Sequence, residues 1–524
     1  MNKFWRVVFS RKIIIFLLLL LQIGILAAGL IFLEAYTEVV YASLEIISAV
    51  VAIRIISSDD NPAYKLAWIL PILVIPIFGT AVYLFYKSQA GVKILKKNAV
   101  SQKHNAAPLL PQSEDVLAEI DGLSEAFFGL CSYMKNYGGF PVYKNDTADY
   151  LSSGEEFFDR FLEDINAAEK FILLEFFIVD DGLMWETILA VLREKAGNGV
   201  AVKIMYDGMG SQMGLPSGYE KKLRSFGLEC KVFNPVRPLV SSIQNNRDHR
   251  KIAVIDGTVA YTGGINLADE YINKRELYGH WKDTAVRVTG EAVWSFTVMF
   301  FELWNIASME PKTAQIIEQN PEMLMRQTNS YRAEKSPEEP PESGFVLPFS
   351  DSPIDDEHIA ESAYIDMISR ANKYVYISTP YLVVDSDMLK TLAYTAKRGV
   401  DVRILTPKIQ DKPYMQILGR SYYKGLIENG VRIYEYTPGF NHAKILVADD
   451  RIAEVGSVNF DFRSLYLHFE CAAILFMCPA ITRIKQDMLD TFAVSEEINL
   501  DKLKTYSLPR RTAGRILKLF APLL

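Results

Sequence analysis

Cysteine is scarce in this chain of 524 residues. Its four cysteines are Cys131, Cys230, Cys471 and Cys478, and no two of them have the C-x-x-C spacing. Structural zinc sites and disulfide frameworks both need clustered cysteines, so the sequence excludes either as the basis of the fold. Cys471 and Cys478 stand among apolar residues, and we expect them to be buried free thiols.

Positive charge is not in excess either. The chain has 56 lysines and arginines against 63 aspartates and glutamates, which gives a formal net charge of -7. Proteins that bind nucleic acid usually carry a basic surface, so nucleic acid is disfavoured as the main partner. The length is too great for one ordinary domain and fits two or three.

Histidine is rare as well, yet two of the six histidines open a repeated pattern. Residues His249–Asp256 and His442–Asp449 both read H-x-K-x-x-x-x-D. Each copy is followed by a G-[GS]-x-N segment, Gly263–Asn266 or Gly456–Asn459, that starts fourteen residues after the histidine. Two matches with the same spacing indicate an internal duplication.

The residue types of this repeat suit phosphate chemistry. The apolar runs Ile252–Ile255 and Ile445–Ala448 predict buried strands. Residues two apart on a strand point to the same face, so each copy presents an imidazole beside an ammonium group. If the two copies face each other, one histidine can attack phosphorus and the other can protonate the leaving oxygen, without a metal. The side chains expected to stabilise the phosphoryl charge are Lys251, Lys444, Asn266 and Asn459.

These paired motifs resemble the phospholipase D superfamily, and the resemblance covers roughly residues 120–524. In that family the two motifs meet at one active site between two similar halves, and the first-half histidine usually forms a covalent phosphohistidine. The resemblance therefore implies that His249 is the nucleophile and His442 the general acid, although the residues alone leave their order open. Asp256 and Asp449 end the motifs and are expected to order the lysine or the turn. The catalytic set that the motifs supply is His249, Lys251, Asp256, His442, Lys444 and Asp449.

Each catalytic imidazole is expected to need a carboxylate that orients it and stabilises its cation. Asp283 is the candidate partner of His249, with a solvated or capping carboxylate as the alternative. Glu470 is the second-half counterpart of Asp283 and the candidate partner of His442.

The order of elements repeats independently of the histidines. In the first half, Glu169–Val179 and Gly199–Asp207 predict strands on either side of a helix at Trp185–Ala196. In the second half, Asn372–Thr379 predicts the equivalent strand, and Ala396–Ile404 the turn and strand that follow. Strand–helix–strand order implies parallel pairs and an α/β fold. With the resemblance, this predicts two similar phospholipase D-like α/β halves packed around one active site.

The N-terminal region is predicted to be a transmembrane helical region that anchors the chain. Ile13–Leu33 is almost wholly apolar and long enough to span a bilayer, with a cleaved signal peptide as the alternative. Leu66–Tyr86 is a second candidate span. Val39–Ile56 is weaker because acidic residues interrupt it, and it fits a third span or a hairpin arm in the interface.

The segment Asn61–Trp68, followed by Pro71, Pro76 and Gly79, resembles the N-terminal membrane region of bacterial cardiolipin synthases. The basic N-terminus and the lysines that follow Tyr86 both favour the cytoplasm. Charge does not decide between two and three spans. We expect a multi-pass protein of the bacterial cell membrane with its catalytic part on the cytoplasmic face.

The proline- and acid-rich segment Pro337–Glu342 predicts a linker between the halves. The predicted organisation is a transmembrane anchor of two or three helices over 1–90, a basic connector over 91–120, a first half over 121–335, a linker over 336–345 and a second half over 346–524.

Three other features allow two interpretations each. Asp207–Ser211 follows a strand and is either part of the site or a plain glycine turn. His280 and His468 lie close in sequence to the site carboxylates and could line the pocket, although a structural role is the safer expectation. The basic and apolar C-terminal segment Arg510–Leu524 fits a helix on an anionic membrane surface or a final helix docked on the core.

The resemblance implies a cardiolipin synthase that joins two phosphatidylglycerols through a phosphohistidine and releases glycerol, with no cofactor. The alternative from the same superfamily is a membrane-bound phospholipase D that hydrolyses phospholipid headgroups. A non-catalytic membrane scaffold is a third hypothesis, which the complete motifs in both halves disfavour. The expected partners are phosphatidylglycerol and the lipid bilayer, with no nucleic acid. Phosphatidylethanolamine as a second substrate and the oligomeric state stay open.

Overall fold

The computed structural model describes Gly24 and residues 38–87, 90–236, 242–307, 320–333, 344–355 and 357–523. Two predicted segments, the span Ile13–Leu33 apart from Gly24 and the linker Pro337–Glu342, lie outside these residues.

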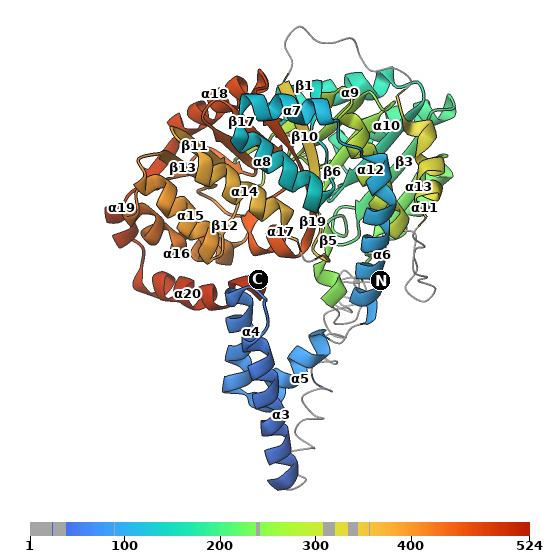
Figure 1. Ribbon diagram of the computed structural model, residues 1–524. Coiled ribbons are helices and arrows are strands. Elements are labelled where there is room, and N and C mark those ends of the chain that lie inside the picture. The colour runs from blue at the N-terminus through green and yellow to red at the C-terminus, as the bar shows by residue number, and fades with distance from the viewer. Residues whose placement is uncertain are drawn as a thin grey trace, which may run out of the picture.

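The two halves of the chain contain the same elements in nearly the same order (Figure 1). The first half consists of β1 (Tyr143–Leu151), α9 (Gly154–Ala167), β2 (Phe171–Phe176), α10 (Leu183–Gly197), β3 (Ala201–Asp207), α11 (Tyr219–Ser225), β4 (Glu229–Phe233), η3 (Ser242–Asn245), β5 (Arg247–Asp248), β6 (Lys251–Ile255), β7 (Val259–Gly263), β8 (His280–Lys282), β9 (Ala285–Thr289) and α12 (Val293–Ala307). The second consists of β10 (Gly344–Asp351), α14 (Ile359–Arg370), β11 (Tyr374–Ser378), β12 (Leu382–Val383), α15 (Ser386–Lys397), β13 (Asp401–Pro407), α16 (Pro413–Glu428), β14 (Arg432–Tyr436), β15 (Gly439–Asn441), β16 (Ile445–Ala448), β17 (Ile452–Gly456), β18 (Phe460–Asp461), α17 (Phe462–Tyr466), β19 (His468–Phe476) and α18 (Ala480–Ala493).

Most of these strands form one continuous sheet whose order is symmetric about its centre. From one edge the order is β20-β14-β13-β11-β16-β17-β19-β10, and it continues as β1-β9-β7-β6-β2-β3-β4, with β20 (Ser495–Ile498) added at the outer edge of the second half. β1 and β10 pair antiparallel where the halves meet. Read outward from this pair, each half lists equivalent strands in the same order, so the duplication and the two similar α/β halves predicted from the sequence are confirmed.

The predicted strands also pair as expected. β2 runs parallel to β3 and antiparallel to β6, and in the second half β11 runs parallel to β13 and antiparallel to β16. All six residues of β2 are buried. A strand that is covered on both faces needs a nearly continuous apolar run, which Phe171–Phe176 supplies except at Glu175, whose buried carboxylate pairs with Arg250.

Helix α12 lies within the body and is apolar around most of its circumference. It is buried at most positions, and the indole Nε1 of Trp294 donates to the carbonyl oxygen of Leu109, 2.8 Å away. A helix that is hydrophobic all round is stable only when other elements surround it. One of its neighbours is α6, which leads from the N-terminal helices to the body (Figure 1). The connecting elements are α6 (Ala90–Ala106), η1 (Ala107–Leu109), α7 (Glu114–Leu123), α8 (Glu125–Tyr133), η2 (Met134–Gly138), α13 (Pro321–Thr328) and η4 (Asn329–Tyr331).

Three N-terminal helices, α3 (Glu38–Ile56), α4 (Pro62–Val74) and α5 (Pro76–Lys87), extend away from the body (Figure 1). Within the described part of the chain, none of the helices combines the length and the apolar character needed to cross a membrane. The candidate span Leu66–Tyr86 is divided between α4 and α5, so a single spanning helix there is not confirmed. The chain leaves helical geometry at Ile75 and folds back, so that a Cβ at Gly79 would lie 2.6 Å from the backbone of Pro71. Proline removes a helical hydrogen bond and glycine permits this close approach.

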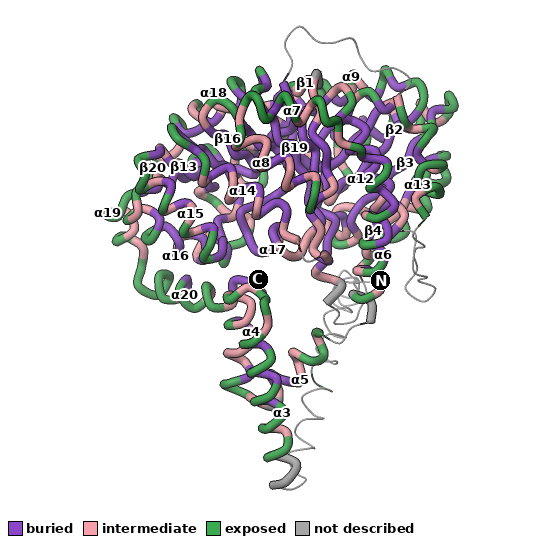
Figure 2. The backbone as a smooth tube through the Cα atoms, in the orientation of Figure 1, coloured by how far each residue is buried: buried purple, intermediate pink, exposed green. Residues whose placement is uncertain are grey.

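The chain ends with α19 (Leu500–Lys504), α20 (Leu508–Leu519) and η5 (Ala521–Leu523). α20 packs against α16, and η5 contacts α4. The structure therefore shows contact between α20 and α16, as in the second of the two interpretations of Arg510–Leu524, and leaves the membrane-surface interpretation open. Most of α20 is nonetheless exposed, as are large parts of α3 and α4, whereas the centre of the body is buried (Figure 2).

Candidate active site

Each motif histidine stands at the start of a strand and is held there by the other half of the chain. The backbone N–H of His249, just before β6, donates to the carbonyl oxygen of Phe469 at 2.9 Å. The N–H of His442, just before β16, donates to the carbonyl oxygen of Lys282 at 2.7 Å. The short strands that precede the histidines also cross over, because β5 pairs with β19 and β15 pairs with β8. The two motifs therefore meet where the halves are joined.

The side chains continue this crossing. Nδ1 of His249 lies 2.9 Å from both carboxylate oxygens of Glu470, and Nδ1 of His442 lies 2.7 Å from Oδ2 of Asp283. The predicted pairing of Asp283 with His249 and of Glu470 with His442 is therefore wrong. Each carboxylate orients the histidine of the opposite half, because β8 and β19 pair with the short strands, β15 and β5, that precede the histidine of the other half. The carboxylates thus engage Nδ1 of each imidazole, and Nε2 of His442 lies 3.1 Å from Nζ of Lys444.

Each carboxylate is itself held by its own half. The hydroxyl of Ser457 donates to Oε2 of Glu470, and the backbone N–H of Thr284 donates to Oδ1 of Asp283 at 2.8 Å. Gly264 occupies the position equivalent to Ser457, and a Cβ there would lie 2.1 Å from Oδ1 of Asp283. The G-[GS]-x-N segments therefore place the carboxylates, which their spacing alone did not reveal.

Two buried lysines complete the motifs. Nζ of Lys251 donates to the carbonyl oxygen of His249, and Nζ of Lys444 to that of His442. Nζ of Lys444 also lies 2.8 Å from Nδ1 of His442. Burial lowers the pKa of Lys251 to about 8 and that of Lys444 to about 7. The charge of Lys251 contributes to the lowering at Lys444 and at His442, so both lysines act on one site.

The two histidine–carboxylate pairs differ electrostatically. Burial, outweighing the carboxylates, holds the pKa of both imidazoles well below the usual value. Burial also raises the pKa of Glu470, but the charge of His249 and its hydrogen bond outweigh this and leave that pKa below its usual value. Burial raises the pKa of Asp283 to about 7, against the opposing charge of Lys444. Glu470 is thus held as an anion, whereas the Asp283 pair retains a proton near neutral pH.

The motif aspartates lie at the far ends of their strands from the histidines. Asp256 accepts hydrogen bonds from the backbone N–H groups of Glu169, Lys170 and Phe171, at 2.7 to 2.8 Å. Asp449 accepts the equivalent bonds from Asn372, Lys373 and Tyr374. The structure therefore does not bring Asp256 or Asp449 to the reacting groups. Both fix the start of the neighbouring strand, β2 or β11.

The two motif asparagines are buried but differ in their contacts. Oδ1 of Asn266 accepts from the backbone N–H of Ile178 at 3.0 Å, and its amide Nδ2 donates to the hydroxyl of Tyr271 at 2.6 Å. Oδ1 of Asn459 has no hydrogen-bond partner among the described residues. Asn266 is thus largely engaged within its own half, and Asn459 is the less constrained of the two.

The two motif histidines contact different sets of rings. His442 packs against the rings of Tyr271, Trp281 and Phe440, with centroids 5.5 to 5.7 Å away. His249 packs against Phe177 at 4.9 Å and His468 at 5.4 Å. The expected structural role for His468 understates its position. Trp281 and His468 each stand two residues before the site carboxylate, and this equivalence is the sequence signal that would have placed both in the site.

Asp207, from the segment with two interpretations, supports the site without reaching it. Its fully buried carboxylate accepts from the backbone N–H groups of Met209, Gly210 and Asp248 and pairs with Arg247 at 3.5 Å. It therefore fixes the residue before His249.

One group of side chains in the described part of the chain is close enough together to bind a metal ion. The ligand atoms of His249, His468 and Glu470 all lie within 4.8 Å of one another. A metal bound there would compete with the hydrogen bond that orients His249. The Glu470 carboxylate would then serve both the ion and the hydrogen bond to His249.

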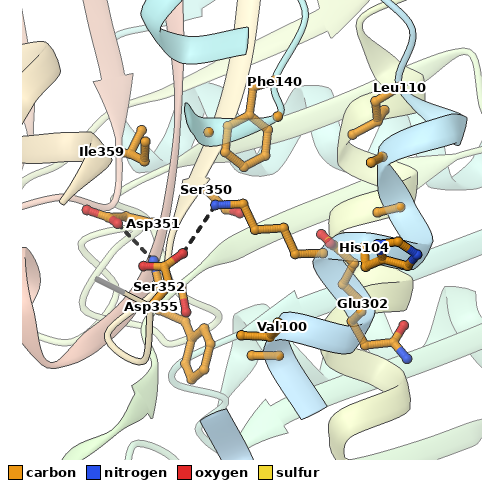
Figure 3. Close-up of a pocket in the computed structure, with 18 of the residues that line it drawn as sticks. Val100, His104, Leu110, Phe140, Glu302, Ser350, Asp351, Ser352, Asp355 and Ile359 are labelled. Carbon is orange, nitrogen blue, oxygen red and sulfur yellow. Dashed lines mark hydrogen bonds and ion pairs between the residues drawn. The ribbon is translucent and has the colours of Figure 1, made fainter. Parts of the chain in front are cut away.

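A cavity of about 360 Å³ lies beside this site, lined chiefly by α6, η2, α12 and β10 (Figure 3). Lys103 pairs with Asp355 across it at 3.3 Å. Arg250 and Phe469 separate it from the motif histidines, which do not line it. The cavity is thus a neighbour of the reacting groups and not their pocket.

The chain was compared with known families and proteins. Residues 161–294 and 364–491 match the family described as "Cardiolipin synthase, PLD-like domain", once in each half. Residues 46–86 match the phospholipase D-nuclease N-terminal family. The two matches to the first family contain both histidines and both site carboxylates.

Proteins named cardiolipin synthase also align with most of this chain. The chain is 32% identical to a cardiolipin synthase of a Geobacillus species over 92% of this chain and 93% of that protein. It is 32% identical to cardiolipin synthase 2 of Bacillus anthracis over 89% of this chain and 88% of that protein. An uncharacterised protein of Streptococcus mutans is 40% identical over 90% of this chain and 98% of that protein.

Among solved structures, the fold is similar to that of phosphatidylserine synthase from Haemophilus influenzae Rd KW20. The TM-score is 0.57 at 16% identity, covering 76% of this chain and 99% of that one. This likeness supports the fold of the two halves.

Proposed function

This chain belongs to the cardiolipin synthase family of phospholipase D-like proteins, and we propose that it makes cardiolipin by transphosphatidylation between two phosphatidylglycerols. The observation that carries the proposal is the crossed arrangement, in which each half completes the other's histidine. Both imidazoles, both lysines and both carboxylates are in place for phosphodiester exchange.

In the first step, Nε2 of His249 attacks the phosphorus of one phosphatidylglycerol. A P–N bond forms, the bond between phosphorus and the glycerol headgroup oxygen breaks, and His442 protonates that oxygen as glycerol leaves. In the second step, the terminal hydroxyl of another phosphatidylglycerol attacks the phosphohistidine. His442 takes its proton, the P–N bond breaks, and cardiolipin forms with His249 restored.

The electrostatic difference between the pairs supports this order. Glu470 is an anion, so it accepts a hydrogen bond from the Nδ1–H group of His249, keeps that proton on Nδ1 and leaves the Nε2 lone pair free to attack. The Asp283–His442 pair holds a proton near neutral pH, which suits a group that must donate one. Lys251 and Lys444, with Asn266 and Asn459, stabilise the phosphoryl oxygens. Asp256 and Asp449 act through the strands they fix.

The membrane is proposed as the site of action because both substrates are lipids. Exposed apolar side chains gather on the N-terminal helices: Ile46, Val50, Ile53 and Ile56 on α3, and Leu66, Leu73 and Val74 on α4. A surface of this kind fits contact with lipid. We propose residues 1–90 as a multi-pass anchor in the bacterial cell membrane, residues 91–120 as a connector, and 121–335 and 346–524 as halves that work on the cytoplasmic face. Residues 336–345 would link them.

The test is a lipid assay on the purified protein in mixed micelles of detergent and phosphatidylglycerol, with a chelator present. Mass spectrometry follows lipids and free glycerol. We expect cardiolipin and glycerol in equal amounts, and loss of both in His249→Ala and His442→Ala. His104→Ala, on α6, is the matched control and should retain activity.

Other products would mean other functions. Phosphatidic acid and glycerol without cardiolipin would identify water as the acceptor and a phospholipase D. Loss of activity with the chelator, restored by a divalent ion, would contradict the metal-free mechanism. Turnover only after phosphatidylethanolamine is added would replace one phosphatidylglycerol with that lipid.

A further inference from the structure

The last helix, α20, has one face that fits the body. A Cβ at Gly514 would lie 2.8 Å from the carbonyl oxygen of Ile417 on α16, so the two helices are in close contact. The ammonium group of Lys518 lies 4.0 Å from the ring centre of Tyr422 on α16. Contact with α16 thus fixes which side of α20 faces outward.

The outward side of α20 carries large apolar side chains, whereas a helix face exposed to water is usually polar. Leu508, Ile516 and Leu519 are 70%, 54% and 47% exposed. Together with Thr512 they follow helical spacing, so they form one stripe opposite Gly514. Exposed leucines and isoleucine in a stripe on a docked helix indicate a partner surface.

Arginines accompany this stripe. Arg510, Arg511 and Arg515 are exposed, and none of the three forms an ion pair within the described part of the chain. By helical spacing, Arg511 and Arg515 flank the apolar stripe, whereas Arg510 is exposed near the start of α20 on the side of Gly514. Guanidinium groups beside an apolar stripe complement a lipid layer, which has anionic headgroups above an apolar interior. The chemistry of an acidic phospholipid layer meets both conditions.

The position of α20 agrees with this chemistry. α20 runs across the end of the body from which α4 and α3 extend (Figure 1). η5, directly after α20, contacts α4. If α3 and α4 enter a bilayer, α20 lies parallel to its surface.

We propose that α20 is an interfacial membrane helix. Leu508, Ile516 and Leu519 insert at the boundary between headgroups and acyl chains, and the arginines bind acidic phospholipid headgroups. This holds the second half at a fixed height above the bilayer. The inference rests on the membrane placement in the proposed function, but not on the reaction itself.

The test uses introduced cysteines, because Cys131, Cys230, Cys471 and Cys478 are all buried. An environment-sensitive fluorophore is attached to Ile516→Cys in the full chain, in vesicles of phosphatidylglycerol and phosphatidylcholine. Thr482→Cys on α18, at the opposite end of the body (Figure 1), is the control. We expect acrylamide to quench position 516 at least about threefold less than position 482, and lipid-borne nitroxides to quench only position 516.

The charge is tested with R510Q, R511Q and R515Q combined. This variant should lose the protection of position 516, whereas K221Q with K222Q on α11 should not. Cardiolipin synthesis is measured in the same vesicles.

Acrylamide quenching at position 516 equal to that at 482, with synthesis intact, would overturn the inference and leave the function standing. Protection of position 516 from acrylamide without cardiolipin synthesis would support the inference and contradict the proposed function. A disulfide between two copies through position 516 would assign the stripe to a dimer and overturn the inference.

Discussion

At the scale of single residues, the site depends on two hydrogen bonds that cross between the halves. His249 bonds to Glu470, 221 positions along the chain, and His442 to Asp283, 159 positions away. Among the residues that the structure describes, neither histidine has a carboxylate partner from its own half. A residue that orients an imidazole and stabilises its cation contributes to the rate through that imidazole. Glu470 and Asp283 are therefore positioning residues.

The first prediction concerns the charge of Glu470. Glu470→Gln keeps the shape of the side chain but removes the anion beside His249. We expect activity to fall by about 10²- to 10⁴-fold with the thermal unfolding temperature nearly unchanged. Glu454→Gln on β17 is the control, since burial raises the pKa of Glu454 to about 8 and an amide resembles its protonated form. Equal losses in both variants would point to general disruption of the sheet instead.

The second prediction separates the motif aspartates from the chemistry. Asp256 has a left-handed backbone, φ 52°, which asparagine tolerates. Asp256→Asn should weaken three hydrogen bonds and lower the free energy of unfolding by about 1 to 3 kcal/mol. Turnover per folded molecule should change only a few-fold, as checked by thermal unfolding beside a lipid assay. A loss of turnover above a hundredfold at unchanged stability would place Asp256 in the reaction after all.

The third prediction follows from the buried lysines. A lysine is charged below its pKa and neutral above it, and the pKa is about 7 for Lys444 and about 8 for Lys251. Phosphate binding needs the charged forms, so kcat/KM should fall as pH rises through 7 to 8. Deprotonation of Asp283, with a pKa of about 7, acts in the same direction. The measurement is kcat/KM for a short-chain phosphatidylglycerol across pH 6 to 9.5. Lys444→Arg should move the fall to higher pH, and a flat profile in the unaltered protein would contradict the account.

At the scale of elements, adjacent strands set the geometry of the site. β7 ends at Gly263. The next residue, Gly264, lies against the carboxylate of Asp283. The second half has Ser457 at this place, whose hydroxyl donates to Glu470. In the second half, the longer side chain of Glu470 is thus matched by the hydroxyl of Ser457. In the first half, the shorter side chain of Asp283 is matched by Gly264, which has no side chain.

The fourth prediction tests this match. Gly264→Ala places a methyl group where Oδ1 of Asp283 now lies and should displace Asp283 from His442. Activity should fall by about a hundredfold or more, and the pH dependence near 7 that Asp283 contributes should disappear. Gly122→Ala on α7, where a Cβ would meet no atom within 4 Å, is the control. Unchanged activity in Gly264→Ala would mean that Asp283 is not needed at its present position.

Sequence patterns predicted the elements better than the contacts between them. Apolar runs gave the strands at Lys251–Ile255 and Ile445–Ala448, because burial on both faces leaves a local signature. The crossed pairs leave none, since β5 with β19 and β15 with β8 form only when the halves dock. The apolar run Leu66–Tyr86 gave a span because its hydropathy is high, yet Pro76 and Gly79 turn it into a helical hairpin.

At the scale of the whole molecule, the sheet joins the halves into a single catalytic unit. β1 and β10 pair at its centre, and α12 is buried beneath. The crossed strand pairs, β5 with β19 and β15 with β8, bring the two motifs together and make each half incomplete alone. The N-terminal helices and α20 then lie at one end of the body (Figure 1), where a membrane would meet it.

The most direct test is detection of the covalent intermediate. The protein is mixed with phosphatidylglycerol, stopped within one turnover in alkaline detergent because a P–N bond is labile to acid, digested and examined by mass spectrometry. The account predicts a phosphatidyl group on the peptide that contains His249, none on the peptide that contains His442, and none in His249→Ala. A phosphatidyl group on His442 instead, or cardiolipin made by His249→Ala, would contradict it.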